Sequence, residues 1–178
     1  LTHGHWDRGD DVLDLTTMVP VNLRPPGVPL PRELGNQFAL VMLPLPTGLR
    51  SPLLRLAETK RRMDSIKNSP EAVLTFGLIN AIGRTHPDVE RFLVNFFAAK
   101  TIGVTTNVAG PTTGRYLAGA LVCGVLGWVP GSGEQTLGIS IFTYDNTVRV
   151  GFKADADSVP HPERLVDALE QELDDLQR

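Results

Sequence analysis

The sequence predicts one α/β domain, built as a single lobe with a mixed β-sheet and flanking helices. Its 178 residues match the length of one domain, and no repeat or linker-like stretch divides them. Segments typical of strands alternate with segments that carry helix-start signals and an apolar period of helical spacing. Because the chain contains 17 glycines and 14 prolines, we expect many turns and few long helices.

Two strands are expected first. Residues 13–24 are rich in β-branched and apolar side chains and stop at Pro25-Pro26, which is typical of a strand. The prolines concentrated in residues 25–31 predict a loop. Residues 34–45 are mostly apolar, and this run predicts a strand that is buried on both faces.

Three helices are expected next, each opened by a polar residue followed by proline. Ser or His before Pro is a helix-start signal, because proline fits the first helical position. The three starts are Ser51-Pro52, Ser69-Pro70-Glu71 and His86-Pro87-Asp88. The first helix would run to about residue 66 and the second to about residue 82. The inner face of the first helix is expected to carry Leu56, Met63 and Ile66.

From residue 100 the pattern changes to strands and ends in a helix. We expect strands over 102–108, 137–144 and 147–153, with a long strand or bent strand pair over 116–129. Asp145-Asn146 suits a tight hairpin turn between the last two strands. The final helix is expected to start near His161-Pro162-Glu163. Its apolar stripe comprises Leu165, Val166, Leu169, Leu173 and Leu176.

The charges are unevenly distributed along the chain. Residues 50–67 carry a net charge of +4 and residues 151–178 a net charge of −5, within a total of −3. Such a balance does not suit a nucleic-acid binder. Residues 101–150 hold only four charged side chains, so we expect most of that surface to be buried.

The composition predicts a cytoplasmic protein. No run approaches the roughly 18 apolar residues of a membrane span, and we find no secretory signal. A single cysteine cannot form an internal disulfide. The chain opens at Leu1 rather than at methionine, from which we expect a piece of a longer protein.

No familiar catalytic signature is present in the sequence. It has no Gly-x-Ser-x-Gly elbow, no phosphate-binding loop and no Gly-x-Gly-x-x-Gly after a strand. Cys123 lies in an apolar run, which favours a buried structural thiol over a nucleophile. His86 and His161 precede prolines, where helix capping is the simplest role. A general base is therefore not visible.

Three further features each allow two interpretations. His3 and His5 fit a frayed terminus better than a metal or hydrolase site, since no further ligand spacing supports them. The basic residues from Lys60 to Lys67 suit a solvated helix face or, alternatively, contacts to the phosphates of a polyanion such as coenzyme A. The third helix presents an aromatic stripe that suits core packing or an acyl-lining surface. Its residues are Phe92, Phe96 and Phe97.

A series of short motifs follows one order along the chain. They are Met18 to Arg24, Leu34-Gly35-Asn36, Leu43-Pro44, Met63 to Lys67, Thr106 to Pro111, Tyr116 to Ala120, Leu137 to Ile141 and Thr143 to Asn146. In this order they resemble the C-terminal domain of bacterial wax ester synthase/diacylglycerol acyltransferases, and the resemblance runs from about residue 14 to residue 176. The family has Asn-Val-Pro-Gly-Pro where this chain has Ala109 in place of the first proline, which implies a less rigid loop.

The resemblance implies a fold like that of the chloramphenicol acetyltransferases, with two α/β lobes and a substrate tunnel between them. Residues 1–178 would form the C-terminal lobe. In the family a histidine of the N-terminal lobe, in a His-His-x-x-x-Asp-Gly motif, takes the proton of the alcohol. This chain has neither adjacent histidines nor an Asp-Gly pair, so we expect it to be inactive alone.

The implied reaction moves a fatty acyl group from acyl-CoA to a diacylglycerol or a long-chain alcohol, which yields triacylglycerol or wax esters. Acyl-CoA would be a co-substrate, with no permanently bound cofactor. The partners would be the N-terminal lobe and these substrates, with no nucleic acid. Peripheral contact with a membrane or lipid droplet would suit such hydrophobic substrates.

The resemblance also assigns candidate site residues. Thr106 and Asn107 would be polar groups at the tunnel, with Gly110 and Pro111 shaping their loop; a purely structural turn is the alternative. The phosphates of coenzyme A would be contacted by Lys60, Arg61 and Arg62. A competing hypothesis is a non-catalytic acyltransferase-like module that binds lipid or serves as a scaffold.

Overall fold

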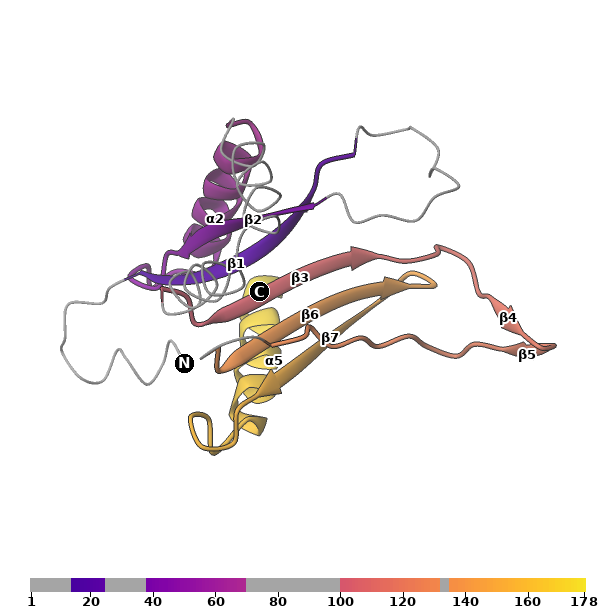
Figure 1. Ribbon diagram of the computed structural model, residues 1–178. Helices are drawn as coiled ribbons and strands as arrows, with labels where there is room; N and C mark the ends of the chain where they lie inside the picture. The colour runs from indigo at the N-terminus through magenta and orange to yellow at the C-terminus, as the bar shows by residue number, and fades with distance from the viewer. Residues whose placement is uncertain (1–13, 25–37, 70–99, 132–134) are drawn as a thin grey trace, which may run out of the picture.

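The computed structural model describes residues 14–24, 38–69, 100–131 and 135–178 (Figure 1). The expected loop over 25–31, the helices expected from Ser69-Pro70 and His86-Pro87, and the residues His3 and His5 lie outside the described residues. The described elements include a five-stranded sheet and two helices. The strands are β1 (Leu15–Asn22), β2 (Phe38–Leu45), β3 (Gly103–Ala109), β6 (Leu137–Tyr144) and β7 (Thr147–Ala154), and the helices are α2 (Pro52–Lys67) and α5 (Glu163–Gln177).

The sheet is mixed, which confirms the predicted fold class. Its strand order is β2-β1-β3-β6-β7. β1 pairs with β2, and β6 with β7, in antiparallel hairpins. β3 lies between the two hairpins and pairs in parallel with β1 and with β6. A parallel pair needs a long crossover connection, and residues 46–102 connect β2 to β3.

The β6–β7 hairpin forms at the predicted turn. Asp145 and Asn146 have φ angles of 48° and 58°. Two consecutive residues with positive φ are typical of a type I′ turn, whose twist matches that of the two strands it joins. The pairing then runs in register from Tyr144↔Thr147 to Leu137↔Ala154.

The core lies between the β1–β2 hairpin and α2. Ala39 and Val41 of β2 are fully buried, and Ile66 of α2 packs against them. We call this side of the sheet the helix face; Val19 of β1, opposite Val41, shares it. β2 was predicted to be buried on both faces, which is wrong. Its fully buried residues alternate with half-buried ones, because successive side chains point to opposite faces and the face with Ala39 and Val41 packs against α2.

Helix α2 begins where the sequence predicts. The Ser51 side chain accepts a hydrogen bond from the backbone N–H of Leu54, and Pro52 occupies the first turn. Ile66 faces inward as expected, but Leu56, predicted to do so, is 57% exposed. In α5, two members of the predicted apolar stripe, Val166 and Leu173, are exposed.

Residues 116–131 form an arm rather than a long strand of the main sheet. Only β4 (Tyr116–Leu117) and β5 (Ala120–Leu121) are strands, paired around a turn in which Ala118 and Gly119 have positive φ. Figure 1 shows the arm extending past the ends of the main strands before it returns along them. The expectation that residues 101–150 are mostly buried is therefore wrong. The scarcity of charge reflects an exposed apolar arm, with Tyr116 72% and Leu117 75% exposed.

Candidate functional site

The predicted tunnel residues lie at the C-terminal end of β3. Neighbouring strand residues point to opposite faces, and the Thr105 hydroxyl meets that of Thr17 on the helix face at 2.9 Å. Thr106 therefore faces the opposite side of the sheet, next to Ser140 of β6 in the pairing register. Asn107 is exposed, and its side chain points to the helix face, like that of Thr105. The structure thus places Thr106 and Asn107 together in the chain but on different faces of the sheet.

Gly110 and Pro111 continue the path of β3 beyond its last paired residue. The Gly110 N–H donates to the carbonyl of Thr143 at 2.8 Å, and the Pro111 carbonyl accepts from the Asp145 N–H at 2.9 Å. A Cβ atom on Gly110 would lie 2.4 Å from the Thr143 carbonyl oxygen, so only glycine fits. These contacts tie the Gly-Pro turn to the β6–β7 hairpin, immediately beside the exposed end of β3.

The return half of the arm, which we call the 122–131 segment, crosses the opposite face of β6 and β7. The Ser140 hydroxyl donates to the Gly127 carbonyl at 2.5 Å, and the Arg149 guanidinium donates to the Cys123 carbonyl at 3.2 Å. The segment comes close because the sheet beneath it carries glycine: a Cβ on Gly138 would lie 3.6 Å from that of Val129. Thr106 and the segment therefore share one face.

A tyrosine hydroxyl fixes the base of the arm. Tyr144 is 2% exposed, and its hydroxyl accepts from the Arg115 N–H at 2.7 Å and donates to the Val122 carbonyl at 2.9 Å. Arg115 and Val122 also bond each other, N–H of Val122 to the Arg115 carbonyl, at 2.8 Å. The Tyr144 hydroxyl thus pairs with a backbone group on each side of the arm, at the point where the arm leaves the sheet.

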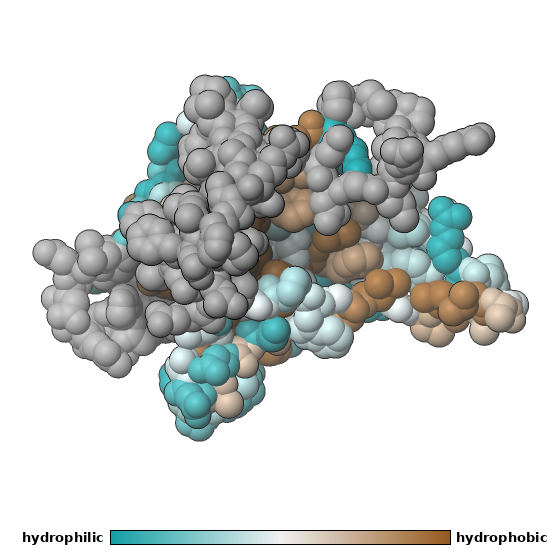
Figure 2. Space-filling model, viewed as in Figure 1, coloured by the Kyte–Doolittle hydropathy of each residue, from teal (hydrophilic) through white to brown (hydrophobic). Residues whose placement is uncertain are grey.

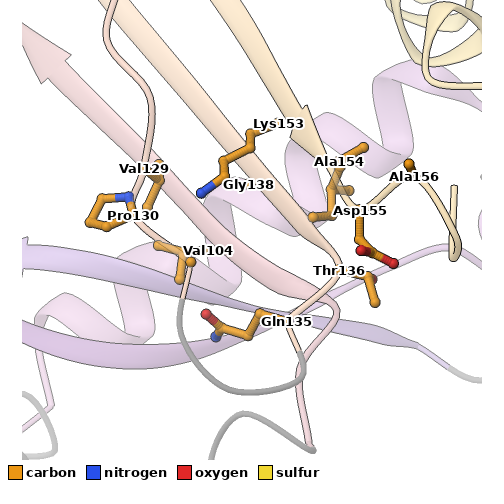
Figure 3. Close-up of a pocket in the computed structure, with 12 residues that line it drawn as sticks. Val104, Val129, Pro130, Gln135, Thr136, Gly138, Lys153, Ala154, Asp155 and Ala156 are labelled. Carbon is orange, nitrogen blue, oxygen red and sulfur yellow. The ribbon is translucent and has the colours of Figure 1, made fainter.

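A pocket opens on the same face, at the end of the 122–131 segment (Figure 3). Its volume is about 340 Å³. Figure 3 shows the ammonium group of Lys153 pointing into it, with Gln135 and Asp155 on its rim. Hydrogen bonds from the side chain and backbone of Ser158 lower the pKa of Asp155, so this carboxylate is ionised near neutral pH. A cation and an anion therefore line one half-open pocket.

Ser140, Lys153 and Asp155 were not predicted from the sequence as residues of the site. Ser140 carried a usable signal, because it is the one hydroxyl within the otherwise apolar run from Leu137 to Phe142. A buried hydroxyl in a strand needs a partner, and here the partner is the 122–131 segment. Lys153 and Asp155 carried no signal that distinguishes them from ordinary surface charges.

The basic residues Lys60, Arg61 and Arg62 lie on α2, where each pairs with a carboxylate. Lys60 bonds Asp64 at 2.5 Å, and Arg61 bonds Glu58 at 2.7 Å. Arg62 bonds Glu58, Asp14 and the Pro44 carbonyl, which ties α2 to the start of β1 and the end of β2. Among the described residues, no hydrogen bond or ion pair joins this cluster to Thr106 or Asn107.

Glu58 is the most perturbed carboxylate of this cluster. Hydrogen bonds from Arg61 and Arg62 lower the pKa of Glu58 from its ordinary value of 4.5 to about 2. A depressed pKa stabilises the folded state above the ordinary pKa, and this contribution is lost as the pH falls toward the folded value. The Glu58 interactions should therefore weaken between about pH 4.5 and pH 2.

We accordingly expect Glu58→Gln to lower the urea midpoint at pH 7 and to have a shrinking effect as the pH falls toward 2. Urea unfolding followed by circular dichroism at a series of pH values measures this difference. Glu170→Gln, at an exposed carboxylate of α5, is the control and should show no such trend. A Glu58→Gln effect that stays constant down to pH 2.5 would contradict the assignment.

The predictions for Cys123 and His161 were both wrong. Cys123 was predicted to be buried and is exposed, since it lies on the arm. His161 was expected to cap α5, but no side-chain cap is formed there; its Nδ1 instead lies 3.1 Å from a carboxylate oxygen of Glu163.

Within the described ranges no cluster of three His, Cys, Asp or Glu side chains is placed to hold a metal. No helix of these ranges is long and apolar enough to cross a bilayer.

Comparison with known proteins identifies relatives that are longer than this chain. Wax ester synthase/diacylglycerol acyltransferase 6 of Arabidopsis thaliana is 29% identical over 141 residues, which cover 78% of this chain and 27% of that protein. The structure of the wax ester synthase/diacylglycerol acyltransferase from Marinobacter aquaeolei VT8 matches with a TM-score of 0.64 and 22% identity. That match covers 93% of this chain and 36% of the Marinobacter chain.

The structural match shows the fold. The chain spans about a quarter of the curated relative and about a third of the solved one. The sequence model of the WS/DGAT C-terminal domain matches residues 34–177, which is most of the chain. The chain therefore belongs to the family of wax ester synthase/diacylglycerol acyltransferase C-terminal domains.

Proposed function

We propose that this chain is the C-terminal half of an acyl-CoA-dependent O-acyltransferase that makes triacylglycerol or wax esters, and that it supplies part of the substrate tunnel. The observation that carries the proposal is the family match over residues 34–177. The names of the Arabidopsis and Marinobacter relatives give the class of reaction. The N-terminal lobe would be the partner and would supply the catalytic histidine.

In the proposed reaction the hydroxyl oxygen of the acceptor attacks the carbonyl carbon of the thioester. The histidine of the N-terminal lobe takes the hydroxyl proton and gives it to the sulfur as the C–S bond breaks, so that coenzyme A leaves as its thiol. This chain would close the tunnel, orient the thioester and exclude the water that would hydrolyse it. The acyl-CoA is a co-substrate in this scheme, with diacylglycerol or a long-chain alcohol as acceptor.

Thr106 is the candidate tunnel residue of this chain with the best support. It faces the side of the sheet that also carries Ser140, the 122–131 segment and the pocket. Gly110 and Pro111 would hold the end of β3 through their bonds to the β6–β7 hairpin. Asn107, exposed on the helix face, would contact substrate only at the open end of β3.

Lys60 and Arg61 remain candidates for the phosphates of coenzyme A. Both are exposed, and their partners lie on their own helix, so a phosphate group can replace those carboxylates with little structural change. Arg62 is the weaker candidate because it also binds Asp14 and the Pro44 carbonyl. A cytoplasmic protein with peripheral contact to a membrane or lipid droplet would suit these substrates.

The test compares the isolated chain with a longer protein in which it follows an N-terminal domain that carries His-His-x-x-x-Asp-Gly. Both are incubated with radiolabelled palmitoyl-CoA and either diolein or hexadecanol, and ester and free coenzyme A are measured. The isolated chain should form no ester and the longer protein should form it. Turnover by the isolated chain, or an inactive but folded longer protein, contradicts the proposal.

Within the longer protein, Thr106→Val tests the role of this lobe. Loss of one polar contact to the substrate should lower kcat/KM by about 10-fold, which corresponds to ~1.4 kcal/mol. Thr112→Val, at an exposed position beyond β3, is the matched control and should leave kcat/KM unchanged. Equal effects of the two substitutions would remove Thr106 from the tunnel.

A further inference from the structure

The pocket at the end of the 122–131 segment contains a lysine without a partner. The ammonium group of Lys153 points into the pocket, and a Cβ atom built on Gly131 would lie 3.6 Å from its Nζ atom (Figure 3). Lys60 of α2 bonds a carboxylate, whereas Lys153 has no hydrogen-bond or ion-pair partner among the described residues. The pocket therefore offers a positive charge that is free to meet an anion.

A second donor in the same pocket also lacks an acceptor. Gln135 lines the pocket, and its Nε2 atom is buried without a hydrogen-bond partner in the part of the chain that the structure describes. In Figure 3 the ends of Gln135 and Lys153 lie on the same side of the pocket, next to Val104. Buried amide groups normally have a partner, and the pocket is the open space from which a ligand can supply the missing acceptor.

The rest of the pocket wall is mainly apolar and suits a small ligand. Its apolar members are Val104, Val129, Pro130, Leu137 and Ala154, and none of the lining residues is aromatic. The volume of about 340 Å³ lies at the low end of the range of about 300–1,000 Å³ for small-molecule pockets. Apolar surface alone does not distinguish the pocket, because it also gathers at the end of the arm that carries β4 and β5 (Figure 2). The combination with two unpartnered donors does.

The charges around the pocket favour an anion with a single negative charge. Lys153 is the one cation among the lining residues, and the Asp155 carboxylate, held by the Ser158 N–H at 3.0 Å, lies on the rim. A phosphate monoester carries nearly two negative charges at neutral pH, so Asp155 would repel it more strongly than it repels a carboxylate. A carboxylate has one charge and two acceptor oxygens, which match one ammonium and one amide donor.

We propose that this pocket binds a small apolar monocarboxylic acid, with its carboxylate at Lys153 and Gln135 and its tail against the apolar wall. The ligand differs from the acyl-CoA, diacylglycerol and alcohol of the proposed reaction, because it carries a free carboxylate. The inference does not rest on that reaction, since every group involved belongs to the described part of this chain.

The test titrates the isotopically labelled 178-residue chain with sodium octanoate and follows amide resonances by nuclear magnetic resonance. The amides of Gly131, Gly138 and Lys153 should shift in a saturable way. Octanol keeps the tail without the charge, and acetate keeps the charge without the tail. Octanoate should bind at least about 10-fold more tightly than either, because each lacks one of the two contributions.

Three variants test the two donors. Lys153→Met should weaken octanoate binding by about 10-fold and Gln135→Leu by about 3-fold, as expected for a charged and a neutral hydrogen bond. Lys67→Met, at an exposed lysine of α2, is the matched control and should leave binding unchanged. None of the three should lower the urea midpoint, because Lys153 and the Gln135 Nε2 atom have no partner in the described chain to lose.

Several results would overturn the inference. Octanol that binds as tightly as octanoate would reduce the pocket to an apolar patch, and an equal effect of Lys153→Met and Lys67→Met would remove the lysine from the site. Displacement of octanoate by equimolar inorganic phosphate or coenzyme A would assign the pocket to phosphate groups. The titration is repeated on the longer protein, where the affinity should be the same; loss of binding there would show that the N-terminal domain fills the pocket.

Discussion

Gly103→Ala should cost the chain at least ~4 kcal/mol of folding free energy, a large share of the 5–15 kcal/mol that stabilises a typical domain. Gly103 opens β3, and a Cβ atom there would lie 1.6 Å from the carbonyl oxygen of Leu137. That oxygen belongs to the backbone of β6, which pairs with Gly103, so it cannot move aside without opening the β3–β6 ladder. We expect the urea midpoint to collapse or the variant to unfold.

Gly48→Ala is the control for Gly103→Ala. No atom lies within 4 Å of a Cβ built on Gly48, and its φ is not positive. The substitution should be neutral or stabilise the chain by up to about 1 kcal/mol, through the smaller entropy of the unfolded chain. Urea unfolding followed by far-ultraviolet circular dichroism compares the two. Equal stabilities of the two variants would show that the strands are not in close contact at Gly103.

Arg55→Met should have the second largest effect, about 2–4 kcal/mol, because Arg55 joins three parts of the chain. Its Nη1 donates to the carbonyls of Leu49 and Arg50 at 2.7 and 2.8 Å, just before α2 begins. Its Nε donates to Glu172 of α5 at 3.1 Å, and Nη2 bonds the same oxygen. The arginine side chain is only 19% exposed, so the loss leaves half-buried acceptors behind.

Arg61→Met on the same helix is the matched control. Among the described residues Arg61 pairs with Glu58 alone, and its side chain is 68% exposed, so its loss should destabilise the chain far less than the loss of Arg55. Both variants keep most of the aliphatic stem, which isolates the effect of the guanidinium group. Glu172→Gln should reproduce part of the Arg55→Met effect. If Arg55→Met costs no more than Arg61→Met, the contact between α2 and α5 does not depend on this arginine.

Local signals in the sequence predicted the elements of the described chain well. Asp145-Asn146 adopts the turn that joins β6 to β7, and Ser51-Pro52 begins α2, because both are preferences of a few adjacent residues. The mixed sheet and the acyltransferase family were predicted too, the family from motifs spread over the whole chain. Where prediction failed, as for Leu56 and Cys123, the error concerned exposure.

Exposure is hard to predict because a run of apolar residues has the same sequence pattern in a core and on an interface. Residues 116–129 suited a buried strand by their lack of charge, yet the sheet has no place for them and they form an arm. The same holds for the candidate site, whose residues were predicted from the sequence but whose placement was not. Thr106 and Asn107 were found from the motif, but only the contacts between strands show which face of the sheet each of them takes.

The sequence by itself determined the family, the types of most elements and the turns between them, since these depend on residues that are neighbours in the chain. The tertiary structure decided which distant groups meet. Arg55 and Glu172 are 117 positions apart, and Ser140 reaches Gly127 only because glycines in β6 and β7 let the 122–131 segment lie close to the sheet. Such contacts depend on the packing of all the strands at once, which no local pattern encodes.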